Sequence, residues 1–434
     1  MADLSVNICG IESPNPFWLA SAPPTNTGDQ IARAFDAGWG GAVWKTLGEP
    51  IENVYSRYSS VDINGSKMMG LNNIELITDR SLEINLIEIE DVKRRYPDNA
   101  VIVSLMVDSN PEAWDTIIKQ VEQAGADGIE LNFGCPHGMS ERGMGAAVGQ
   151  VPEYTCDITI WAKESATVPV FVKLTPNITD IRMAARAAKR GGADAVSLIN
   201  TINSITGVDL DSFTPRPVVG GMSSHGGYCG PAVKPIALNM VASIAADPET
   251  ADLPISGIGG IENWKDVAEY ILLGSTTIQV CTAVMHYGYR IVEGMQEGLS
   301  NYLDSKGMSS VNELRGKSVE RVTTWENLDI NYVIKAEIDQ EKCIGCALCY
   351  IACEDGAHQA IGAKPTKDGK TEVWIKTDDC VGCNLCSLVC PVQGCISMVE
   401  QDLGQTSMTW AEYSSDDPPG ELIPRPKHEV TTRG

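Results

Sequence analysis

Eight cysteines near the C-terminus carry the clearest chemical signature in this sequence. They form two copies of one spacing, Cys343-x2-Cys346-x2-Cys349-x3-Cys353 and Cys380-x2-Cys383-x2-Cys386-x3-Cys390-Pro391. In such a run, three thiolates from one tight loop bind three irons of a cube, and the fourth cysteine binds the other cluster of the pair. The spacing therefore predicts one 4Fe–4S cluster on Cys343, Cys346, Cys349 and Cys390, and a second on Cys380, Cys383, Cys386 and Cys353.

A pair of zinc sites is the alternative interpretation of these cysteines. The duplicated spacing has no histidine partner, which favours iron–sulfur clusters over zinc. Glu354 follows Cys353 where a proline is usual, and we expect it to affect the backbone and not the ligands. Cys395 lies outside both runs, and we expect it to be a buried spare cysteine. Because clusters carry single electrons, we expect the substrate chemistry elsewhere in the chain.

Polar residues at the ends of apolar runs form a second candidate site. They are Ser21, Lys45, Thr46, Asn132, Lys173, Asn200, Thr201 and Thr282. A buried lysine needs a counter-charge, which an anionic ligand would supply. GIGGIEN (257–263) and VCTAV (280–284) suit a phosphate bound by backbone N–H groups. Beside iron–sulfur clusters this indicates flavin mononucleotide (FMN), because a flavin accepts single electrons and donates a hydride. Lys173 near the ring atom N1 would stabilise the anionic reduced flavin.

Cys135 is the candidate for proton transfer. It lies three residues beyond Asn132, on the glycine-rich segment 133–152. A thiol on a loop over a flavin can exchange a proton with the carbon next to the one that exchanges hydride. His137 is a candidate to tune this thiol, although a histidine on a solvent-facing loop is the more common case. The remaining cysteines of the barrel suit small packing roles: Cys9, Cys156, Cys229 and Cys281.

Repeated units of helix, glycine and short apolar strand must position these residues. The whole pattern occurs at 35–46, 121–132, 188–201 and 270–282. Four glycines suit the left-handed position after a helix: Gly38, Gly125, Gly191 and Gly274. Further strands are expected at 17–21, 101–107, 168–174 and 254–258. Eight βα units predict a closed (β/α)8 barrel of the TIM type, with its chemistry at the carboxyl ends of the strands. The alternative, an open doubly wound sheet, lacks a G-x-G-x-x-G motif.

The chain is expected to divide into a large α/β domain and a small one. The predicted parts are the barrel with the active site at 1–310, a linker at 311–337, a small α+β ferredoxin-like domain with both clusters at 338–400, and a polar tail at 401–434. The connections at 47–99 and 133–152 are long and suit lids or binding loops.

The composition is strongly acidic. With 57 acidic and 33 basic residues among 434, the formal charge is −24, which would repel nucleic-acid phosphates and anionic lipids. No apolar run approaches the ~20 residues that cross a bilayer, and the first residues lack a secretory pattern. We therefore expect a cytoplasmic protein with no nucleic-acid or membrane partner and no disulfide framework.

Several motifs together with both cysteine runs resemble the dihydropyrimidine dehydrogenase family, among them LNFGCPHGMSERGMGAAVGQ, FVKLTPNITDI, GIGGIE and QVCTAV. The barrel is also similar to the wider dihydroorotate dehydrogenase group. The resemblance implies that FMN lies against Ala20, Ser21, Lys45, Thr46, Lys173, Gly230, Gly259, Gly260, Cys281 and Thr282. It implies that the pyrimidine is bound by Asn73, Glu75, Asn132, Asn200 and Thr201, beside Gly134, where relatives usually carry serine.

The resemblance also implies the reaction. Uracil or thymine would interconvert with the 5,6-dihydro form, with hydride exchange between FMN and C6 and with Cys135 as general acid or base at C5. The clusters would relay electrons from a partner subunit that holds FAD and binds NAD(H) or NADP(H), on a homodimer core of a heterotetramer. A dihydroorotate or other cyclic-amide dehydrogenase is the enzymatic alternative. An electron carrier on an inert barrel is the non-enzymatic one.

Overall fold

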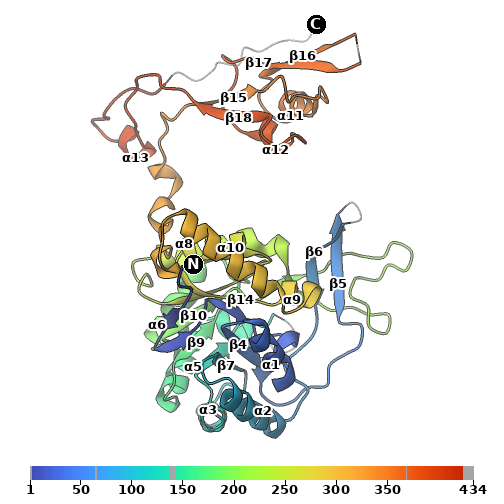
Figure 1. Cartoon of the computed structure of the whole chain (residues 1–434), viewed down its shortest axis with the longest axis vertical. Helices are drawn as coiled ribbons and strands as arrows, with labels where there is room; N and C mark the ends of the chain where they lie inside the picture. Colours follow the sequence, from blue (N-terminus) through green and yellow to red (C-terminus); the bar gives the residue numbers. More distant parts are fainter. Residues whose placement is uncertain (1, 64–65, 137–141, 368, 424–434) are drawn as a thin grey trace. The chain divides into compact units, whose positions relative to one another are not determined.

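A computed structural model describes residues 2–63, 66–136, 142–367 and 369–423 of the chain, which forms two compact units, Met1–Val322 and Thr323–Gly434 (Figure 1). Each unit has its own hydrophobic core. Residues 424–434 of the predicted tail lie outside the described residues, and the predicted linker and tail boundaries stay predictions. No helix in the described part of the chain is long and apolar enough to cross a membrane.

Eight parallel strands close the barrel of the first unit and confirm the eight predicted strands. In chain order they are β3 (Phe17–Leu19), β4 (Gly41–Leu47), β7 (Ala100–Leu105), β8 (Gly128–Asn132), β9 (Val170–Lys173), β10 (Ala195–Leu198), β13 (Ile255–Ile258) and β14 (Ser275–Val280). Barrel strands that follow one another in the chain pair around the ring, and β14 pairs with β3. These strands are buried along their whole length, as parallel strands between an inner core and an outer helix layer must be.

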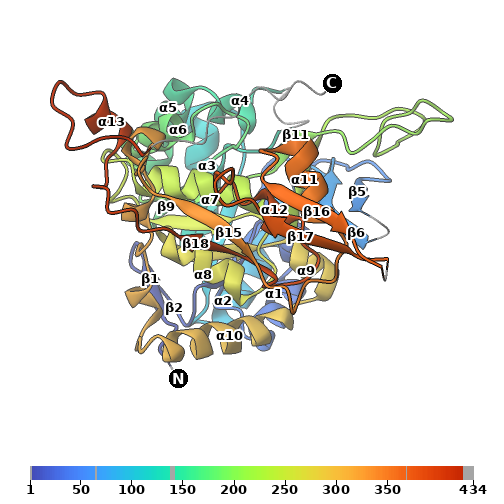
Figure 2. The same ribbon diagram turned by 90° about the horizontal axis from the view of Figure 1, so that it is seen from above.

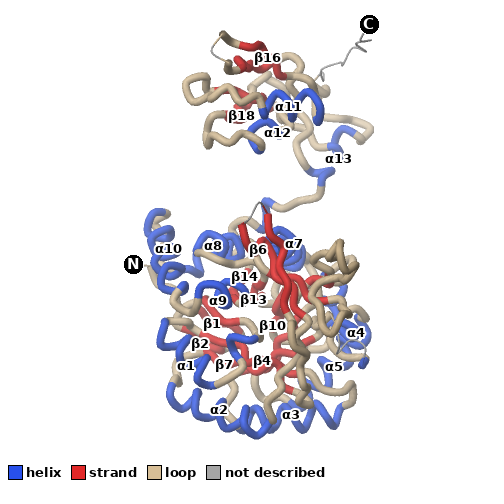
Figure 3. The backbone as a smooth tube through the Cα atoms, turned by 90° about the vertical axis from the view of Figure 1, so that its right-hand side faces the viewer, coloured by secondary structure: helices blue, strands red, loops and turns tan. Residues whose placement is uncertain are grey.

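Helices that follow the barrel strands in the chain cover the outside of the barrel (Figure 3). They are α1 (Gly28–Ala37), α2 (Leu82–Arg95), α3 (Pro111–Gln123), α4 (Ala146–Gly149), α5 (Pro152–Ser165), α6 (Ile181–Arg190), α7 (Lys234–Ala245), α8 (Trp264–Leu272), α9 (Thr282–Tyr287) and α10 (Ile291–Ser305). The side chains of Thr27, Ser81 and Asn110 accept backbone N–H bonds at the starts of α1, α2 and α3, which satisfies donors that the helix leaves unpaired.

Glycines end several of these helices in the left-handed conformation. Three of the predicted positions have positive φ, namely Gly38 (110°), Gly125 (91°) and Gly274 (109°). The prediction for Gly191 is wrong: its φ is −72°, and Gly192 takes a φ of 89° instead. Gly191 has a packing role, because a Cβ there would lie 2.6 Å from Cβ of Thr159, where α6 approaches α5.

The barrel interior changes from apolar to polar toward the carboxyl ends of the strands. Near the amino ends, the side chains of Trp18, Val43 and Phe171 pack against the hairpin of β1 (Val6–Ile8) and β2 (Ile11–Ser13). Further along the strands, the fully buried interior side chains are polar: Ser104, Glu130, Ser197, Ser256 and Gln279. Buried polar groups must find partners inside the protein, so this layer fixes the side chains around it.

A second sheet stands at the carboxyl end of the barrel and was not predicted (Figures 1 and 3). Its strands are β5 (Tyr58–Ile63), β6 (Ser66–Asn73), β11 (Ile202–Ser204) and β12 (Gly226–Cys229), in the antiparallel order β11–β12–β6–β5. Two long connections supply it, one after β4 and one after β10. A Cβ at Gly70 would lie 1.9 Å from the Tyr228 hydroxyl, so glycine is needed where this ring crosses β6.

One ion pair in the helix layer gives the stability a defined pH dependence. Arg186 donates from Nε and Nη2 to the two carboxylate oxygens of Asp247, at 2.7 and 2.9 Å. Hydrogen bonding to Arg186 lowers the pKa of Asp247, so the unfolded chain takes up this proton at higher pH than the folded chain. The stabilisation that this ion pair provides is therefore complete above the unfolded pKa of Asp247, about 4, and is lost as the pH falls through the lower folded pKa.

We expect Asp247→Asn to lower Tm at neutral pH. The Tm difference between this variant and the native chain should shrink in melts below about pH 4. A Tm difference that stays the same at every pH would contradict this prediction.

In its described residues, the second unit has two small antiparallel ladders and three short α-helices (Figure 2). β15 (Ile334–Ile338) pairs with β18 (Ile396–Glu400), and β16 (Ile361–Pro365) pairs with β17 (Thr371–Ile375). The helices α11 (Leu348–Gly356) and α12 (Leu385–Leu388) each carry the third cysteine of a run, and α13 (Trp410–Tyr413) follows. This is the predicted α+β arrangement. Helix α11 continues through Glu354, where proline would interrupt it, whereas α12 ends before Pro391.

Candidate functional site

The carboxyl ends of the barrel strands surround a cavity that is partly open to solvent. Every barrel residue predicted for the site lines it except Gly134: Ala20, Ser21, Lys45, Thr46, Asn73, Glu75, Asn132, Cys135, Lys173, Asn200, Thr201, Gly230, Gly259, Gly260, Cys281 and Thr282. Tyr58, Leu71 and Tyr228 of the second sheet line it as well. The fold therefore brings together residues from all parts of the barrel sequence.

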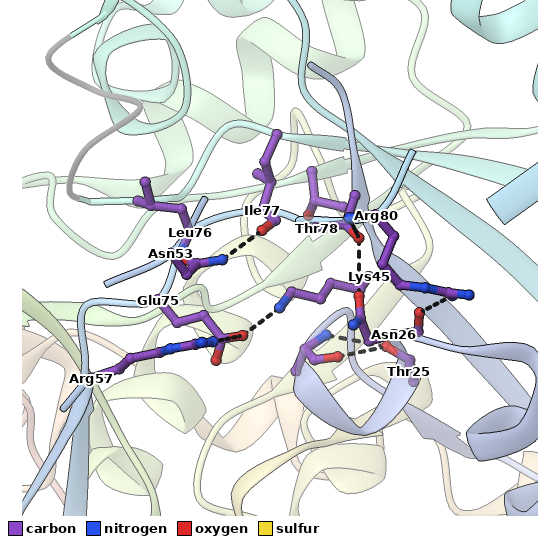
Figure 4. Close-up of polar contacts among 12 residues, drawn as sticks. Thr25, Asn26, Lys45, Asn53, Arg57, Glu75, Leu76, Ile77, Thr78 and Arg80 are labelled. Carbon is purple, nitrogen blue, oxygen red and sulfur yellow. Dashed lines mark hydrogen bonds and ion pairs between the residues drawn. The ribbon is translucent and has the colours of Figure 1, made fainter. Parts of the chain in front are cut away.

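Lys45 and Glu75 form a buried ion pair in this cavity (Figure 4). Lys45 Nζ lies 2.5 Å from Glu75 Oε1, and Arg57 Nη1 lies 3.2 Å from the same oxygen. Tyr58 donates its hydroxyl to the other oxygen of Glu75. Burial raises the pKa of Tyr58, and the hydrogen bond to Glu75 raises it further, so the hydroxyl remains a donor. The counter-charge expected from a ligand of Lys45 is thus supplied by Glu75.

Lys173 is paired with Glu130 inside the barrel. Lys173 Nζ lies 3.4 Å from Glu130 Oε1, and the two side chains are only 6% and 1% exposed. The other oxygen, Oε2, accepts hydrogen bonds from Ser197 Oγ at 2.7 Å and from Gln279 Nε2 at 3.2 Å. Glu130 Oε1 accepts no hydrogen bond from the described residues. The positive charge of Lys173 therefore offsets the cost of burying this oxygen.

Two asparagine amides in the cavity orient each other. Asn132 Nδ2 donates to Thr46 Oγ1 at 3.0 Å, and Asn132 Oδ1 accepts from Asn200 Nδ2 at 3.0 Å. Asn200 Oδ1 accepts the backbone N–H of Thr201 at 2.7 Å. An amide nitrogen has two hydrogens, and each of these uses one within the protein. Each amide therefore keeps one donor for a ligand.

Gly134 lies behind Asn200 and does not line the cavity. Its N–H donates to Asn132 Oδ1 at 3.2 Å. A Cβ at Gly134 would lie 2.3 Å from Asn200 Cβ and 2.5 Å from Asn200 Nδ2. Glycine at this position therefore provides the space that the Asn200 side chain occupies.

This contact predicts the effect of Gly134→Ser. The added Cβ and hydroxyl displace Asn200 and break its hydrogen bond with Asn132. Loss of one such positioned donor costs about 1.4 kcal/mol, which raises KM about tenfold for a substrate bound through this amide. Steady-state kinetics with bound flavin measured in parallel test this prediction. Gly207→Ser, where a Cβ would meet nothing within 4 Å, is the matched control. Equal KM values for the two variants would refute the steric role of Gly134.

Cys135 lies half-buried on the loop between β8 and α4 and lines the cavity. Its carbonyl accepts the N–H of Ala146 at 3.0 Å, which ties the loop to the start of α4. Gly145 has a φ of 58°, and a Cβ there would lie 2.8 Å from that carbonyl oxygen. His137 lies outside the described residues, so its tuning of the thiol stays a prediction.

Three glycines with positive φ form another part of the cavity lining: Gly230 (96°), Gly259 (129°) and Gly260 (68°). A Cβ at Gly260 would lie 2.8 Å from Lys234 Cβ. The N–H groups of Gly259 and Gly260 donate to no acceptor in the described part of the chain. Gln279 Oε1, buried beside the cavity, is also unpaired among the described residues. Free backbone donors suit a phosphate, so these residues fit FMN.

Two neighbouring thiols of the lining are neutral. Burial raises the pKa of Cys229 to about 11, and burial also raises the pKa of Cys281. Cys281 Sγ lies 3.7 Å from Met285 Sδ. Both thiols therefore behave as packing groups around any flavin in the cavity.

The second unit contains two smaller cavities lined by cysteines. One is lined by Cys353, Cys380, Cys383 and Cys386. The other is lined by Cys343, Cys346, Cys349 and Cys390. This is the grouping predicted from the spacing, with the fourth cysteine of each run in the cavity of the other. Four soft thiolates around each cavity fit a 4Fe–4S cluster. Cys395, predicted to be a buried spare, also lines the second of these cavities.

The fold and these two kinds of site define a barrel oxidoreductase with an attached electron-transfer unit. Residues 3–303 match the dihydroorotate dehydrogenase family, and residues 336–398 match the 4Fe–4S dicluster domain. The chain belongs to the dihydroorotate dehydrogenase family. FMN and two 4Fe–4S clusters are its cofactors.

The chain is similar to several curated dehydrogenases. The NAD-dependent dihydropyrimidine dehydrogenase subunit PreA of Escherichia coli (strain K12) is 46% identical over 360 residues, which cover 83% of this chain and 87% of that protein. The chloroplastic dihydropyrimidine dehydrogenase (NADP(+)) of Arabidopsis thaliana is 44% identical over 75% of this chain and 79% of its own. The catalytic subunit of dihydroorotate dehydrogenase B (NAD(+)) of Pyrococcus abyssi is 36% identical over 73% and 99%, respectively.

Sequence reasoning missed several side chains that hold the site. Glu130, Arg57, Tyr58 and Tyr228 were not predicted. Glu130 carries a detectable signal, because a carboxylate within the apolar strand GIELN must have a buried partner. Arg57 and Tyr58 lie in a connection without a clear strand pattern, so only the folded structure places them at Glu75.

Proposed function

We propose that this chain interconverts uracil or thymine with the corresponding 5,6-dihydropyrimidine. The proposal depends on one observation: Cys135, Asn132 and Asn200 line the same cavity, and that cavity also fits FMN. Amides offer both donors and acceptors, which suits the alternating N–H and C=O groups of a pyrimidine ring. The relatives from Escherichia coli and Arabidopsis thaliana bear the name dihydropyrimidine dehydrogenase, which supports this ring.

The charges around the cavity favour a neutral ring over a carboxylated one. Among the described lining residues, Lys45 is paired with Glu75, and Lys173 is paired with Glu130. A dihydroorotate dehydrogenase needs a positive group for the substrate carboxylate. These ion pairs occupy the two lysines of the cavity, so dihydroorotate is the second candidate.

The roles of the residues follow from their positions. FMN, when bound, would exchange a hydride with C6 of the ring. Cys135 would donate a proton to C5 during ring reduction and accept it during ring oxidation. Asn132 and Asn200 would each donate the remaining amide hydrogen to a ring carbonyl. Glu75, fixed by Lys45, Arg57 and Tyr58, would accept from a ring N–H.

We also propose how the reducing equivalents reach the barrel. The clusters would pass single electrons between the flavin and a partner subunit that holds FAD and binds NAD(H) or NADP(H). The similar Escherichia coli protein is named a subunit, which supports a partner of this kind. A homodimer core within a heterotetramer is the assembly proposed.

Anaerobic titration of the purified holoprotein tests the function. Dihydrouracil or dihydrothymine should bleach the visible flavin absorption at low concentration, and uracil should restore it after reduction. Dihydroorotate is the comparison. Bleaching by dihydroorotate alone would establish the second candidate. A flavin that responds to none of these rings would indicate an electron carrier.

A further inference from the structure

Cys395 is a fifth thiol in the cavity of the first cluster. It is 2% exposed and lines the same cavity as Cys343, Cys346, Cys349 and Cys390. Cys395 is not among the predicted ligands, because a cubane cluster takes four cysteines and the other four already supply them. Its position inside the cavity wall needs a separate explanation.

The backbone around Asp339 holds Cys395 beside two of the predicted ligands. Asp339 N donates to Cys395 O at 2.8 Å, and Cys395 Sγ lies 3.6 Å from Asp339 O. The same Asp339 carbonyl accepts the N–H of Cys343 at 3.0 Å. Cys395 also belongs to the buried cluster against which Cys390 and Cys343 pack. Cys395 is thus fixed near both sulfurs without replacing either of them.

The second cluster cavity offers an internal comparison. Cys395 follows Cys390 by five residues, and the residue that follows Cys353 by the same interval is His358. His358 lines the second cavity, whose cysteines are Cys353, Cys380, Cys383 and Cys386. Among the described residues, a fifth cysteine therefore lines the first cavity and not the second.

We propose that Cys395 is a reserve ligand of the first 4Fe–4S cluster. When the bond from Cys390 to iron is absent, the Cys395 thiol releases its proton to solvent, and its sulfur binds the iron left open. The exchange involves no change in oxidation state. It preserves the cluster after damage to Cys390, which lies beside Cys395 in the cavity. The inference rests on the cluster cavities and does not depend on the substrate of the barrel.

Iron and sulfide analysis of the full chain, purified without oxygen, tests the proposal. Cys390→Ala should keep the iron content of the native chain, and Cys390→Ala/Cys395→Ala should lose about half of it, because one of two equal clusters is lost. Cys395→Ala alone should keep both clusters. Electron paramagnetic resonance of the dithionite-reduced proteins should show two clusters in both single variants and one in the double variant.

Two controls separate ligand loss from misfolding. Bound FMN reports on the barrel in every variant. Cys353→Ala/His358→Ala, the matched change at the second cavity, should lose half of the iron. Loss of a cluster in Cys390→Ala alone, equal iron in Cys390→Ala and its double variant, or loss in Cys395→Ala alone would each overturn the proposal. Cys343→Ala, with and without Cys395, repeats the test if Cys390→Ala does not accumulate.

Discussion

Cys135→Ala is expected to lower turnover of dihydrouracil by a factor of about 10² to 10⁴, the range that a positioned general acid or base contributes. Flavin content and the binding of uracil should stay unchanged, because alanine removes the proton-transferring group and leaves the amides of Asn132 and Asn200 in place. Single-turnover reduction of the flavin, followed anaerobically by absorption, measures the step directly. The loss should appear in the rate constant and not in the substrate concentration at half saturation.

The control for this prediction is Cys156→Ala. Cys156 is half-buried in α5 and does not line the cavity, so its replacement should leave the reduction rate unchanged. Full activity of Cys135→Ala would refute its role at C5. A fall in activity together with loss of flavin would instead place Cys135 in the structure of the cofactor site.

Lys173→Met is expected to lower the free energy of unfolding by about 3–5 kcal/mol, because it leaves the Glu130 carboxylate buried without its positive partner. Glu130 has no exposure to solvent and keeps only the hydrogen bonds from Ser197 and Gln279. Urea unfolding of the flavin-free chain, followed by fluorescence of the buried tryptophans, measures the loss without a contribution from ligand binding.

The double variant Lys173→Met/Glu130→Gln separates the ion pair from other effects. Both charges are then absent, so the double variant should be more stable than the sum of the single losses predicts. Glu130→Gln alone should also destabilise the chain, because Lys173 then lacks its anion. Additive losses in the three variants would show that the two side chains do not interact. Lys173→Met should in addition weaken FMN binding if Lys173 contacts the flavin.

Much of the architecture was predictable because it depends on local patterns. The eight barrel strands are short apolar runs, and all but the first follow a segment with helical periodicity, so pattern and length agree. The left-handed positions at Gly38, Gly125 and Gly274 were predicted for the same reason, since only the nearest backbone decides φ. Gly191 differed because the left-handed position falls one residue later, at Gly192, and Gly191 instead leaves room for Thr159 of the neighbouring helix.

The second sheet was not predictable from local pattern. The strand SKMMGLNN has no regular alternation, and β6 obtains its partners from β5 and from β12, which lies far along the chain. This sheet supplies Tyr58 and Tyr228 to the cavity. The sequence predicted a binding loop there, and tertiary pairing determines that the loop contains strands.

The sequence alone determined the kinds of chemistry in this protein: thiolates at cluster spacing, a thiol on a glycine-rich loop, and lysines and amides at strand ends. These features depend on residue type and on neighbours within a few positions. Only the tertiary structure decided which groups neutralise or crowd one another, as in Lys173 with Glu130, Gly134 with Asn200, and Cys395 with the first cluster cavity. Such contacts join residues distant in sequence, and their energies depend on burial and on distances of a few ångströms, which the folded chain alone sets.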